Sequence, residues 1–373
     1  MRSGEGSGPP PNVSPSEPIS SQPRTENSAL DTLRGLLPRS VVSALGLVFV
    51  GLLIVWVIGN FAQSPSEFFN VFLIGLTNGA VYGLIALGYT LVYGILQLIN
   101  FAHGDVFALG GLVASSMILT VFDLTTSTAA LVLVLALAAT LVIAMVFGAG
   151  LNASIELVAY RRLRNAPRLA PLITAVGMSF LLQNVGLIGW GVEYQSIPRL
   201  VPNSIAFSLG SVDFQWNKVA VLLITIPVLL GLTYLVKATR QGKAMRATSQ
   251  DPEAAAMMGV NVNRTISFTF ILAGGLAGAA GVLYLLNFTT MRYDQGFQLG
   301  LIAFTAAVLG GIGNMSGALV GAITIGLIEA FNEGLSWYTP GSDWTRSIVF
   351  GLLIAILVFR PEGILGERTP EGQ

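Results

Sequence analysis

The stretch AALVLVLALAATLVIAMVFGAGL, residues 129–151, decides the fold class of this chain. No charged side chain interrupts it. About 20 apolar residues in an α-helix are enough to cross the hydrocarbon core of a bilayer, which is about 30 Å thick. Because lipid offers no hydrogen-bond partners, the backbone groups of such a run must be satisfied within the segment, as they are in a helix. The stretch therefore predicts a membrane-spanning α-helix.

Further apolar runs extend to both sides of this stretch. The predicted spans are Val41–Phe61, Phe68–Ile99, Val106–Val121, Ala129–Leu151, Ala170–Trp190, Val219–Val236, Ile266–Asn287, Phe297–Ile312, Gly317–Leu335 and Ser347–Phe359. The second run is too long for one straight helix, and we expect it to break at Gly83 or Gly88. The run 297–312 is short, and is either a span or a re-entrant segment. The sequence thus predicts an all-α, polytopic transmembrane helical bundle with eight to ten spans, ten being favoured.

The composition of the whole chain agrees with this prediction. Hydrophobic residues make up 53%, charged residues only 10%, and the mean hydropathy is +0.73. About a quarter of an ordinary soluble chain is charged. A formal net charge of zero argues against nucleic-acid binding. Because the chain has no cysteine and His103 is its single histidine, disulfides, thiolate zinc sites and histidine-rich metal sites are excluded, and no metal site is predicted.

The two ends of the chain differ from its apolar middle. Residues 1–40 begin with a Pro-, Ser- and Gly-rich sequence without apolar periodicity, which predicts a disordered tail. The run that starts at Val41 is too long for the apolar core of a signal peptide, so we expect an uncleaved span. The predicted organisation is this tail, a transmembrane domain of residues 41–360 and a short tail of residues 361–373.

Basic residues near the span ends predict the orientation, since Lys and Arg are enriched on the cytoplasmic side. The clusters are Arg34 and Arg39; Arg161, Arg162, Arg164 and Arg168; Lys237, Arg240, Lys243, Arg246 and Arg264; Arg360 and Arg368. With ten spans, both termini and every cluster lie in the cytoplasm. The longest external segment is then 191–218, which is too short for an independent domain.

Glycines recur at every fourth residue in two of the spans and at the start of a third. They are Gly75, Gly79 and Gly83; Gly274 and Gly278; and Gly313, Gly317 and Gly321. Such spacing places glycines on one helix face, where they let helix backbones approach closely in lipid. We expect helix packing at these positions. The alternative is that close packing also leaves a narrow path between helices.

Polar side chains inside the spans are candidates for lining such a path. Polar groups in a membrane helix are costly unless they are paired or face a cavity. Asn78 and Tyr82 lie one turn apart, with Tyr89 further along the same run. Glu329 lies within a later apolar run, with Glu333 one turn on. Each is either a path residue or a partner for a neighbouring helix, and Glu333 is also placed to reach the outer interface.

The segment Asn100–Asp105 lies between two apolar runs and contains Asn100, His103 and Asp105. We expect Asp105 to cap the following helix, where a carboxylate is stabilised by the helix dipole. The alternatives are a role in gating or substrate passage, or a proton relay through His103 and Asp105.

A loop of residues 237–264 carries the most informative pattern. Its central residues are Asp251, Pro252, Glu253, Ala254, Ala255, Ala256, Met257, Met258 and Gly259. Asp251 suits a helix N-cap, Pro252 its first position and Gly259 its end. The pattern predicts a short cytoplasmic helix with exposed Ala and Met, which fits a groove on a partner. The alternative is an interfacial helix, with Lys237, Arg240, Lys243 and Arg246 touching anionic headgroups.

The chain lacks the phosphate-binding loop of an ATPase. Gly242-Lys243 is followed by Ala244, and Lys237 stands where the first glycine of that loop would be required. The chain therefore has no ATP site of this type, and no catalytic residue is predicted in it.

Several segments resemble one family of permeases. They are Leu98-Ile99-Asn100-Phe101-Ala102-His103-Gly104-Asp105, residues 240–259, Ala307-Val308-Leu309-Gly310-Gly311-Ile312-Gly313-Asn314, and Leu357-Val358-Phe359-Arg360-Pro361-Glu362-Gly363. In this order they are similar to the LivH-type permeases, the inner-membrane subunits of branched-chain amino acid ABC importers. The resemblance covers roughly residues 68–366. Glu253-Ala254-Ala255 with Gly259 resembles the EAA loop through which such permeases contact their ATPase.

The resemblance implies a permease subunit that forms the translocation path for branched-chain or related amino acids and lacks its own ATPase site. Its implied location is the bacterial inner membrane. The implied partners are two ABC ATPase subunits that carry ATP and Mg²⁺, a second LivM-like permease or a second copy of this chain, and an extracytoplasmic substrate-binding protein. The family more often has Glu at the position of Asp105, which leaves urea or short amides open as substrates. Residues 1–61 lie outside this resemblance, and we expect them to be an N-terminal extension that adds a span to the family's usual number.

Two other classes of function stay open from the residues. An ion-gradient-driven secondary transporter would need buried ionisable groups, for which Asp105 and Glu329 are the candidates. A membrane scaffold without transport would explain the hydrophobicity but not the predicted Ala- and Met-faced helix.

Overall fold

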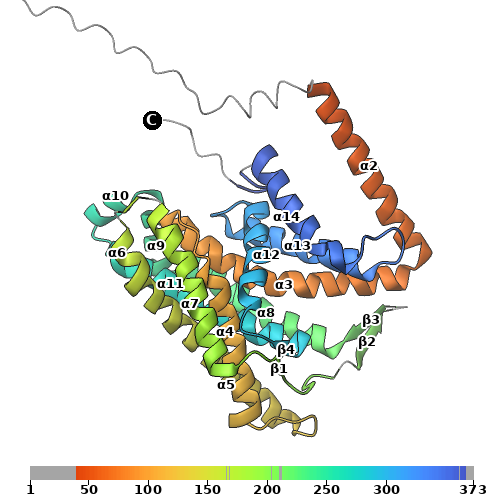
Figure 1. The fold of residues 1–373 in the computed structure, drawn as a ribbon, viewed down its shortest axis with the longest axis horizontal. Helices are drawn as coiled ribbons and strands as arrows, with labels where there is room; N and C mark the ends of the chain where they lie inside the picture. The colour runs from red at the N-terminus through yellow and green to blue at the C-terminus, as the bar shows by residue number, and fades with distance from the viewer. Residues whose placement is uncertain are drawn as a thin grey trace, which may run out of the picture. The chain divides into compact units, whose positions relative to one another are not determined.

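The computed structural model describes residues 39–164, 166–167, 169–202, 204–209, 212–360 and 362–366 (Figure 1). The predicted N-terminal tail lies outside the described residues except for its last two positions. The predicted C-terminal tail lies outside them except for residues 362–366. The described residues divide into two units, one that ends at Ile58 and one that begins at Gly59. The second unit holds nearly all the helices.

The described residues are almost entirely helical. The helices are α2 (Arg39–Gln63), α3 (Pro65–Leu96), α4 (Ala102–Ser116), α5 (Ala130–Ile155), α6 (Arg161–Leu163), α7 (Leu169–Trp190), α8 (Trp216–Ala238), α9 (Arg240–Gln250), α10 (Pro252–Met257), α11 (Val262–Phe288), α12 (Gln295–Gly310), α13 (Met315–Gly334) and α14 (Ser342–Phe359). Two π-helices, η1 (Met117–Val121) and η2 (Glu156–Tyr160), follow α4 and α5. The strands are β1 (Gln195–Ser196), β2 (Ile205–Leu209), β3 (Val212–Gln215) and β4 (Thr290–Met291).

Eight helical segments within the described residues are long and apolar enough to cross a membrane. The predicted polytopic helical bundle is therefore confirmed. Two further apolar helices, Gly51–Gln63 and Gln295–Gly310, are shorter. They correspond to the first and eighth predicted spans, so the count of ten stays a prediction, as does the cytoplasmic placement of both termini.

Helix α3 runs unbroken for 32 residues, so the predicted break at Gly83 or Gly88 is wrong. A Cβ atom on Gly83 would lie 3.0 Å from the Leu319 side chain, and one on Gly88 would collide with the His103 ring. Neighbouring side chains thus fill the space that each glycine leaves. The helix keeps its backbone hydrogen bonds, as a segment within lipid must.

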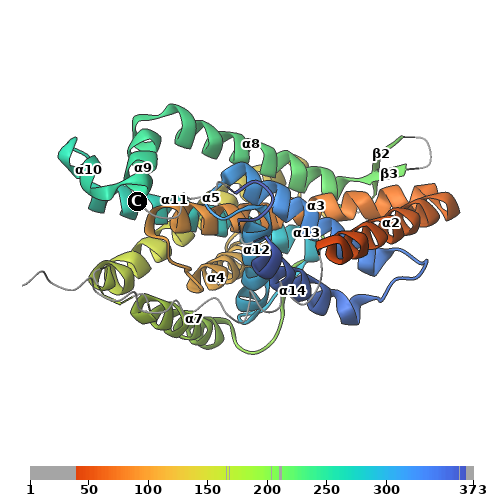
Figure 2. The same ribbon diagram turned by 90° about the horizontal axis from the view of Figure 1, so that it is seen from above.

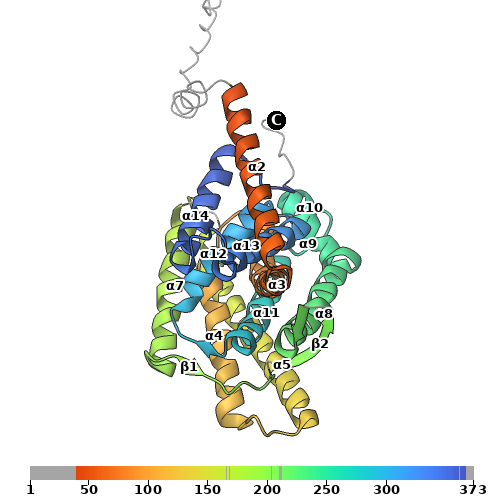
Figure 3. The same ribbon diagram turned by 90° about the vertical axis from the view of Figure 1, so that its right-hand side faces the viewer.

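Three helices form the centre of the second unit. Most residues of α3, α4 and α11 are buried, whereas α5, α7, α8 and α14 expose most of theirs. In the view along α3, helices α4, α11, α12 and α13 surround it, and α7 and α8 lie on opposite sides (Figure 3). The exposed faces are apolar, with Leu131, Val134 and Leu135 of α5 as examples. Such faces suit contact with lipid.

Glycines set the closest helix contacts. Gly75 and Gly79 of α3 lie against the backbone of Gly326 and Ile323 of α13, which runs antiparallel to α3. Other close pairs include Gly274 with Gly148, Gly278 with Ala144, Gly317 with Gly310, and Gly321 with Ala306. Because a side chain at these positions would meet backbone atoms, the helices can approach only through glycine.

Gly313 does not share this arrangement. It precedes α13, has φ of +96°, and a Cβ atom on it would meet nothing within 4 Å. The prediction that Gly313 packs on a helix face together with Gly317 is therefore wrong. Gly313 lies in a turn with a positive φ, the conformation for which glycine is the default residue.

Two small antiparallel pairs complete the fold. Strand β1 pairs with β4, and β2 pairs with β3 in a hairpin in which the rings of Phe207 and Phe214 stack 4.4 Å apart. The hairpin immediately precedes α8, and α9 immediately follows α8. A helix of 23 residues is about 34 Å long. The hairpin and α9–α10 therefore lie at opposite ends of the bundle (Figure 2).

Candidate functional site

Helix α10 has the local structure that its sequence predicts. The Asp251 side chain accepts hydrogen bonds of 2.9 Å from the backbone N–H groups of Glu253 and Ala254, so it is the N-cap. Pro252 occupies the first position, where a missing N–H costs nothing. Gly259 follows the helix with φ of +85°, which a residue with a side chain rarely adopts. The predicted cap and end of this helix are confirmed.

One face of α10 packs against the protein and the other is exposed. Met257 and Met258 are 82% and 85% exposed, whereas Ala255 is buried. The prediction that the Ala and Met side chains are all exposed is therefore wrong for Ala255. A fixed inner face and a protruding outer face make α10 a small apolar projection, and methionine adapts its shape to a partner surface.

Helix α9 attaches this projection to the bundle. Its N-cap is Thr239, whose hydroxyl accepts from the Gly242 N–H at 3.1 Å. The Arg246 guanidinium donates to the Val236 carbonyl at the C-terminal end of α8. Basic side chains stabilise a helix C-terminus in this way. Arg246 is exposed, as are Lys237, Arg240 and Lys243, but its guanidinium is bonded within the chain.

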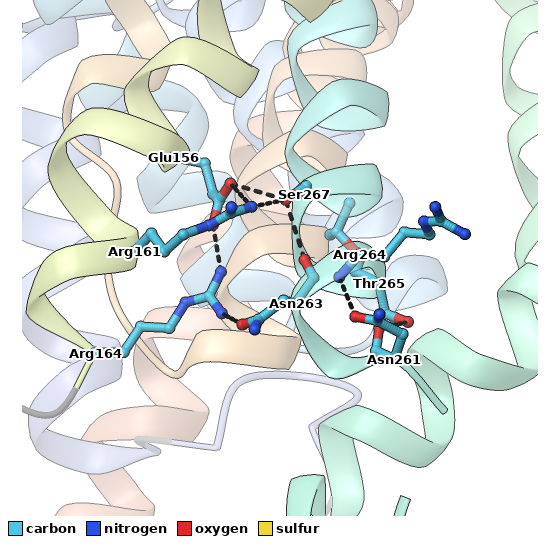
Figure 4. A network of polar contacts seen from close by, with 9 residues as sticks. Glu156, Arg161, Arg164, Asn261, Asn263, Arg264, Thr265 and Ser267 are labelled. Carbon is cyan, nitrogen blue, oxygen red and sulfur yellow. Dashed lines mark hydrogen bonds and ion pairs between the residues drawn. The ribbon is translucent and has the colours of Figure 1, made fainter. Parts of the chain in front are cut away.

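The turn after α10 leads directly into a central helix. The Asn261 side chain accepts from the Arg264 N–H at 3.0 Å and so caps α11 (Figure 4). The first turns of α11 then contact the segment that follows α5, through Asn263 and Ser267. A displacement of α10 would therefore reach α11 through a capped turn.

Three of the predicted path residues gather near the other end of the bundle. The Glu329 carboxylate of α13 interacts with the Tyr82 hydroxyl of α3, and its Oε2 atom is buried without a hydrogen-bond partner among the described residues. Asn78, one turn from Tyr82, accepts a 3.3 Å hydrogen bond from Asn287 of α11. Residues Asn78, Tyr82, Asn287 and Glu329, with Tyr284 beside them, form what we call the α3–α11–α13 polar cluster.

Asn100 lies apart from this cluster, in a buried network between helices. It accepts from the Tyr160 hydroxyl at 3.1 Å and donates to the Asn152 side chain at 3.3 Å. Asn152 in turn donates to the Phe270 carbonyl at 2.7 Å. Because these bonds occupy Asn100 on both sides, its side chain joins α5, η2 and α11 to the start of α4.

His103 and Asp105 lie on the same helix but contact different neighbours. The fully buried His103 ring packs against Gly88 and lies 4.9 Å from the Tyr89 ring, both on α3. Asp105 accepts a hydrogen bond from Ser179 of α7. The two side chains therefore form no direct proton relay.

Asp105 does not cap the helix, so that prediction is wrong. Helix α4 begins at Ala102, and the N-cap position is Phe101, which makes no side-chain cap bond. Asp105 lies within the first turn instead, at the positive end of the helix dipole.

Comparison with known proteins now gives the family. A family model described as "Branched-chain amino acid transport system / permease component" matches residues 71–358. This chain belongs to that permease family. The resemblance to LivH-type permeases is thereby confirmed, and so is the predicted location as a multi-pass inner-membrane protein.

Individual relatives agree with this assignment. The chain is 39% identical over 300 residues to the high-affinity branched-chain amino acid transport system permease protein BraD of Pseudomonas aeruginosa, covering 80% of this chain and 95% of BraD. It is 37% identical over 303 residues to the permease protein LivH of Escherichia coli K12, with the same coverage. A solved structure, PsaBC from Streptococcus pneumoniae in complex with Fab, matches with a TM-score of 0.42 and 17% identity over 83% of this chain and 97% of that chain, a likeness too low to carry an argument.

Sequence reasoning missed several buried polar residues. Glu156 is completely buried, and Asn152 and Ser179 also lie inside the bundle. Glu156 carries a signal in the sequence, because it ends a long apolar run as a lone carboxylate and is followed by Arg161 and Arg164. Asn152 and Ser179 carry none, because their partners come from segments far away in the chain.

Proposed function

We propose that this chain is a permease subunit of an ABC importer for branched-chain amino acids. Family membership and the words "branched-chain amino acid transport" in the descriptions of its relatives support the substrate class. The observation that carries the ATP-driven mechanism is α10, with Met257 and Met258 exposed outside the spans. A small apolar helix at one end of a bundle fits a groove on a partner protein.

The mechanism places the ATPase at the α9–α10 end, on the cytoplasmic side. Two ATPase subunits carry ATP and Mg²⁺, and each receives an α10 helix, one from this chain and one from a second permease or a second copy of this chain. Closure of the ATPases moves α10, and the Asn261 cap passes this movement into α11. Packed helices then rock between two arrangements.

The α3–α11–α13 polar cluster is proposed to line the path. It lies toward the end opposite α10, where an external binding protein would deliver substrate. A buried carboxylate with a free oxygen, as at Glu329, suits the ammonium group of an amino acid. Tyr82 and Asn78 add hydrogen-bonding groups on the facing helix.

The alternative of an ion-driven transporter receives less support from the geometry. Its two candidate carboxylates contact different helices, since Asp105 bonds to α7 and Glu329 interacts with α3. An ion site needs several oxygen ligands around one point. Two carboxylates with separate neighbours do not make such a site.

Co-purification of the ATPase subunits encoded with this permease tests the proposal. The double variant Met257→Glu, Met258→Glu places two charges on the exposed face of α10 and should remove the ATPase from the complex. Gln250→Glu, on an exposed position of α9, is the matched control and should leave it bound. Equal recovery of the ATPase with both variants would contradict the docking role and favour a helix that lies on the membrane surface.

A further inference from the structure

Glu156 is a buried carboxylate at an irregular point of the longest apolar segment. It is the first residue of the π-helix η2, which joins α5 to α6. Its side chain is inaccessible to solvent. π-Helical turns are rare and are often found at functional sites. A buried charge is retained only when it is paired and hydrogen-bonded.

Two arginines from its own segment neutralise this carboxylate. Arg161 approaches it with two nitrogen atoms, at 3.3 Å from Oε1 and 3.1 Å from Oε2. Arg164 makes a second ion pair, with Oε1. Burial lowers the pKa of Arg164 while the Glu156 charge opposes this, and an arginine keeps its proton in either case.

The same three side chains reach across to α11. The Ser267 hydroxyl lies 2.8 Å from Glu156 Oε2 and accepts from Arg161 at 2.7 Å (Figure 4). Arg164 donates to the Asn263 side chain. We call these five residues, Glu156, Arg161, Arg164, Asn263 and Ser267, the Glu156 clamp. It joins the end of α5 to the beginning of α11.

The α11 side of the clamp lies close to α10 along the chain, so a movement of α10 would act on it directly. Asn263 and Ser267 belong to the first turns of α11, immediately after the Asn261 cap and the turn that follows α10. Further along, α11 and α5 are already in backbone contact through Gly274 and Gly148. The clamp extends this contact to the end of the helix pair at which α10 would push.

We propose that the Glu156 clamp is a positioning element for transport, through which displacement of α10 moves α5 together with α11. The inference rests on the proposed function, because it assumes that α10 is displaced by an ATPase. Without the clamp, the start of α11 would follow α10 while the Arg161–Arg164 turn stayed behind. ATP hydrolysis would then be transmitted only in part to the helix bundle.

The test compares ATP hydrolysis and leucine uptake in the same proteoliposomes, using the full complex. The variant Asn263→Ala, Ser267→Ala cuts the clamp from α11 but leaves Glu156 paired with both arginines, so the buried charge stays neutralised. We expect ATPase subunits to remain bound and uptake per ATP hydrolysed to fall by about threefold or more. Glu156→Gln should act in the same direction.

The matched control is Ser154→Ala, since Ser154 is exposed and its hydroxyl bonds only to its own helix at Gly150. It should leave uptake per ATP unchanged. An unchanged ratio in the folded double variant would overturn the proposal.

A second measurement does not depend on transport. Because the chain has no cysteine, spin labels can be attached at Met258→Cys, the residue directly after α10, and at Val158→Cys, an exposed position of η2. The distance distribution between them should broaden when Asn263 and Ser267 are replaced by alanine, and an unchanged distribution would overturn the clamp. A wild-type complex without ATP-driven uptake would overturn the proposed function, while the distance measurement would still decide whether these contacts join the two segments.

Discussion

Gly79 of α3 lies against the backbone of Ile323 of α13, so closely that a Cβ atom on Gly79 would be 2.7 Å from the Ile323 Cα. The neighbouring obstacle is the Ala322 carbonyl oxygen, 3.0 Å from the same point. Both are backbone atoms, which cannot move aside by changing a rotamer. The α3–α13 contact therefore depends on the absence of a side chain at Gly79.

The variant Gly79→Leu should lose the folded bundle. A large side chain against backbone costs about 3 kcal/mol or more, since overpacking of a close-packed interior forces backbone shifts. Thermal stability in detergent, followed by size-exclusion chromatography, measures this loss. Gly231→Leu on α8 is the control, because a Cβ atom there meets nothing within 4 Å. Wild-type stability of Gly79→Leu would show that α3 and α13 do not pack in this way.

The variant Asp251→Ala should weaken the ATPase contact without unfolding the bundle. Loss of an N-cap costs about 1 kcal/mol, which corresponds to about fivefold weaker binding if α10 must be folded to dock. Titration of the detergent-solubilised permease with purified ATPase measures the affinity. Asp251→Asn should bind like the wild type, since asparagine caps equally well. Equal loss in both variants would mean that the charge matters and not the cap.

The variant Glu329→Gln should impair transport while the protein stays folded. It keeps the shape of the side chain but removes the charge that is proposed to bind the substrate ammonium group. The loss of one charge-assisted interaction predicts about tenfold lower uptake. Initial rates of leucine uptake in proteoliposomes, with thermal stability measured in parallel, check this. Unchanged kinetics would assign Glu329 to helix packing alone.

The variant Asn152→Ala should destabilise the bundle at the α5–α11 contact. It leaves the Phe270 carbonyl and the Asn100 amide group without their partner, which typically costs about 1–3 kcal/mol for a buried group. Thermal unfolding in detergent gives the size of the effect. A melting temperature equal to that of the wild type would imply that water replaces the missing bonds.

The parts of the fold that the sequence predicted follow from short-range rules. The lengths of the apolar runs predicted the helices. The Asp251, Pro252 and Gly259 pattern predicted α10, because capping depends on residues within one turn. The glycine spacing on α3 gave a packing face. It could not give the partner, since the contact of Gly75 with Gly326 joins residues far apart in the chain.

The errors have physical causes that are also specific. A break was expected in α3 because it exceeds the bilayer thickness, yet a helix in a tertiary fold can extend beyond the lipid when neighbours cover it. Asp105 was expected to cap α4 because it looked like the residue before the helix, but α4 starts at Ala102. The role of Glu156 was missed because it depends on contacts with Asn263 and Ser267, which only folding brings close to it.

The extra residue in the π-helix η2 sets the direction in which Arg161 and Arg164 project from the helix axis. Each residue of a helix advances the chain by about 100° around the axis. A π turn holds about one residue more than an α turn, so refolding all five residues of η2 as an ordinary α-helix would rotate Arg161 and Arg164 by about that angle relative to α5. Both guanidinium groups would then point away from Asn263 and Ser267, although no amino acid had been substituted, whereas deleting one residue of η2 at the same time would restore their direction.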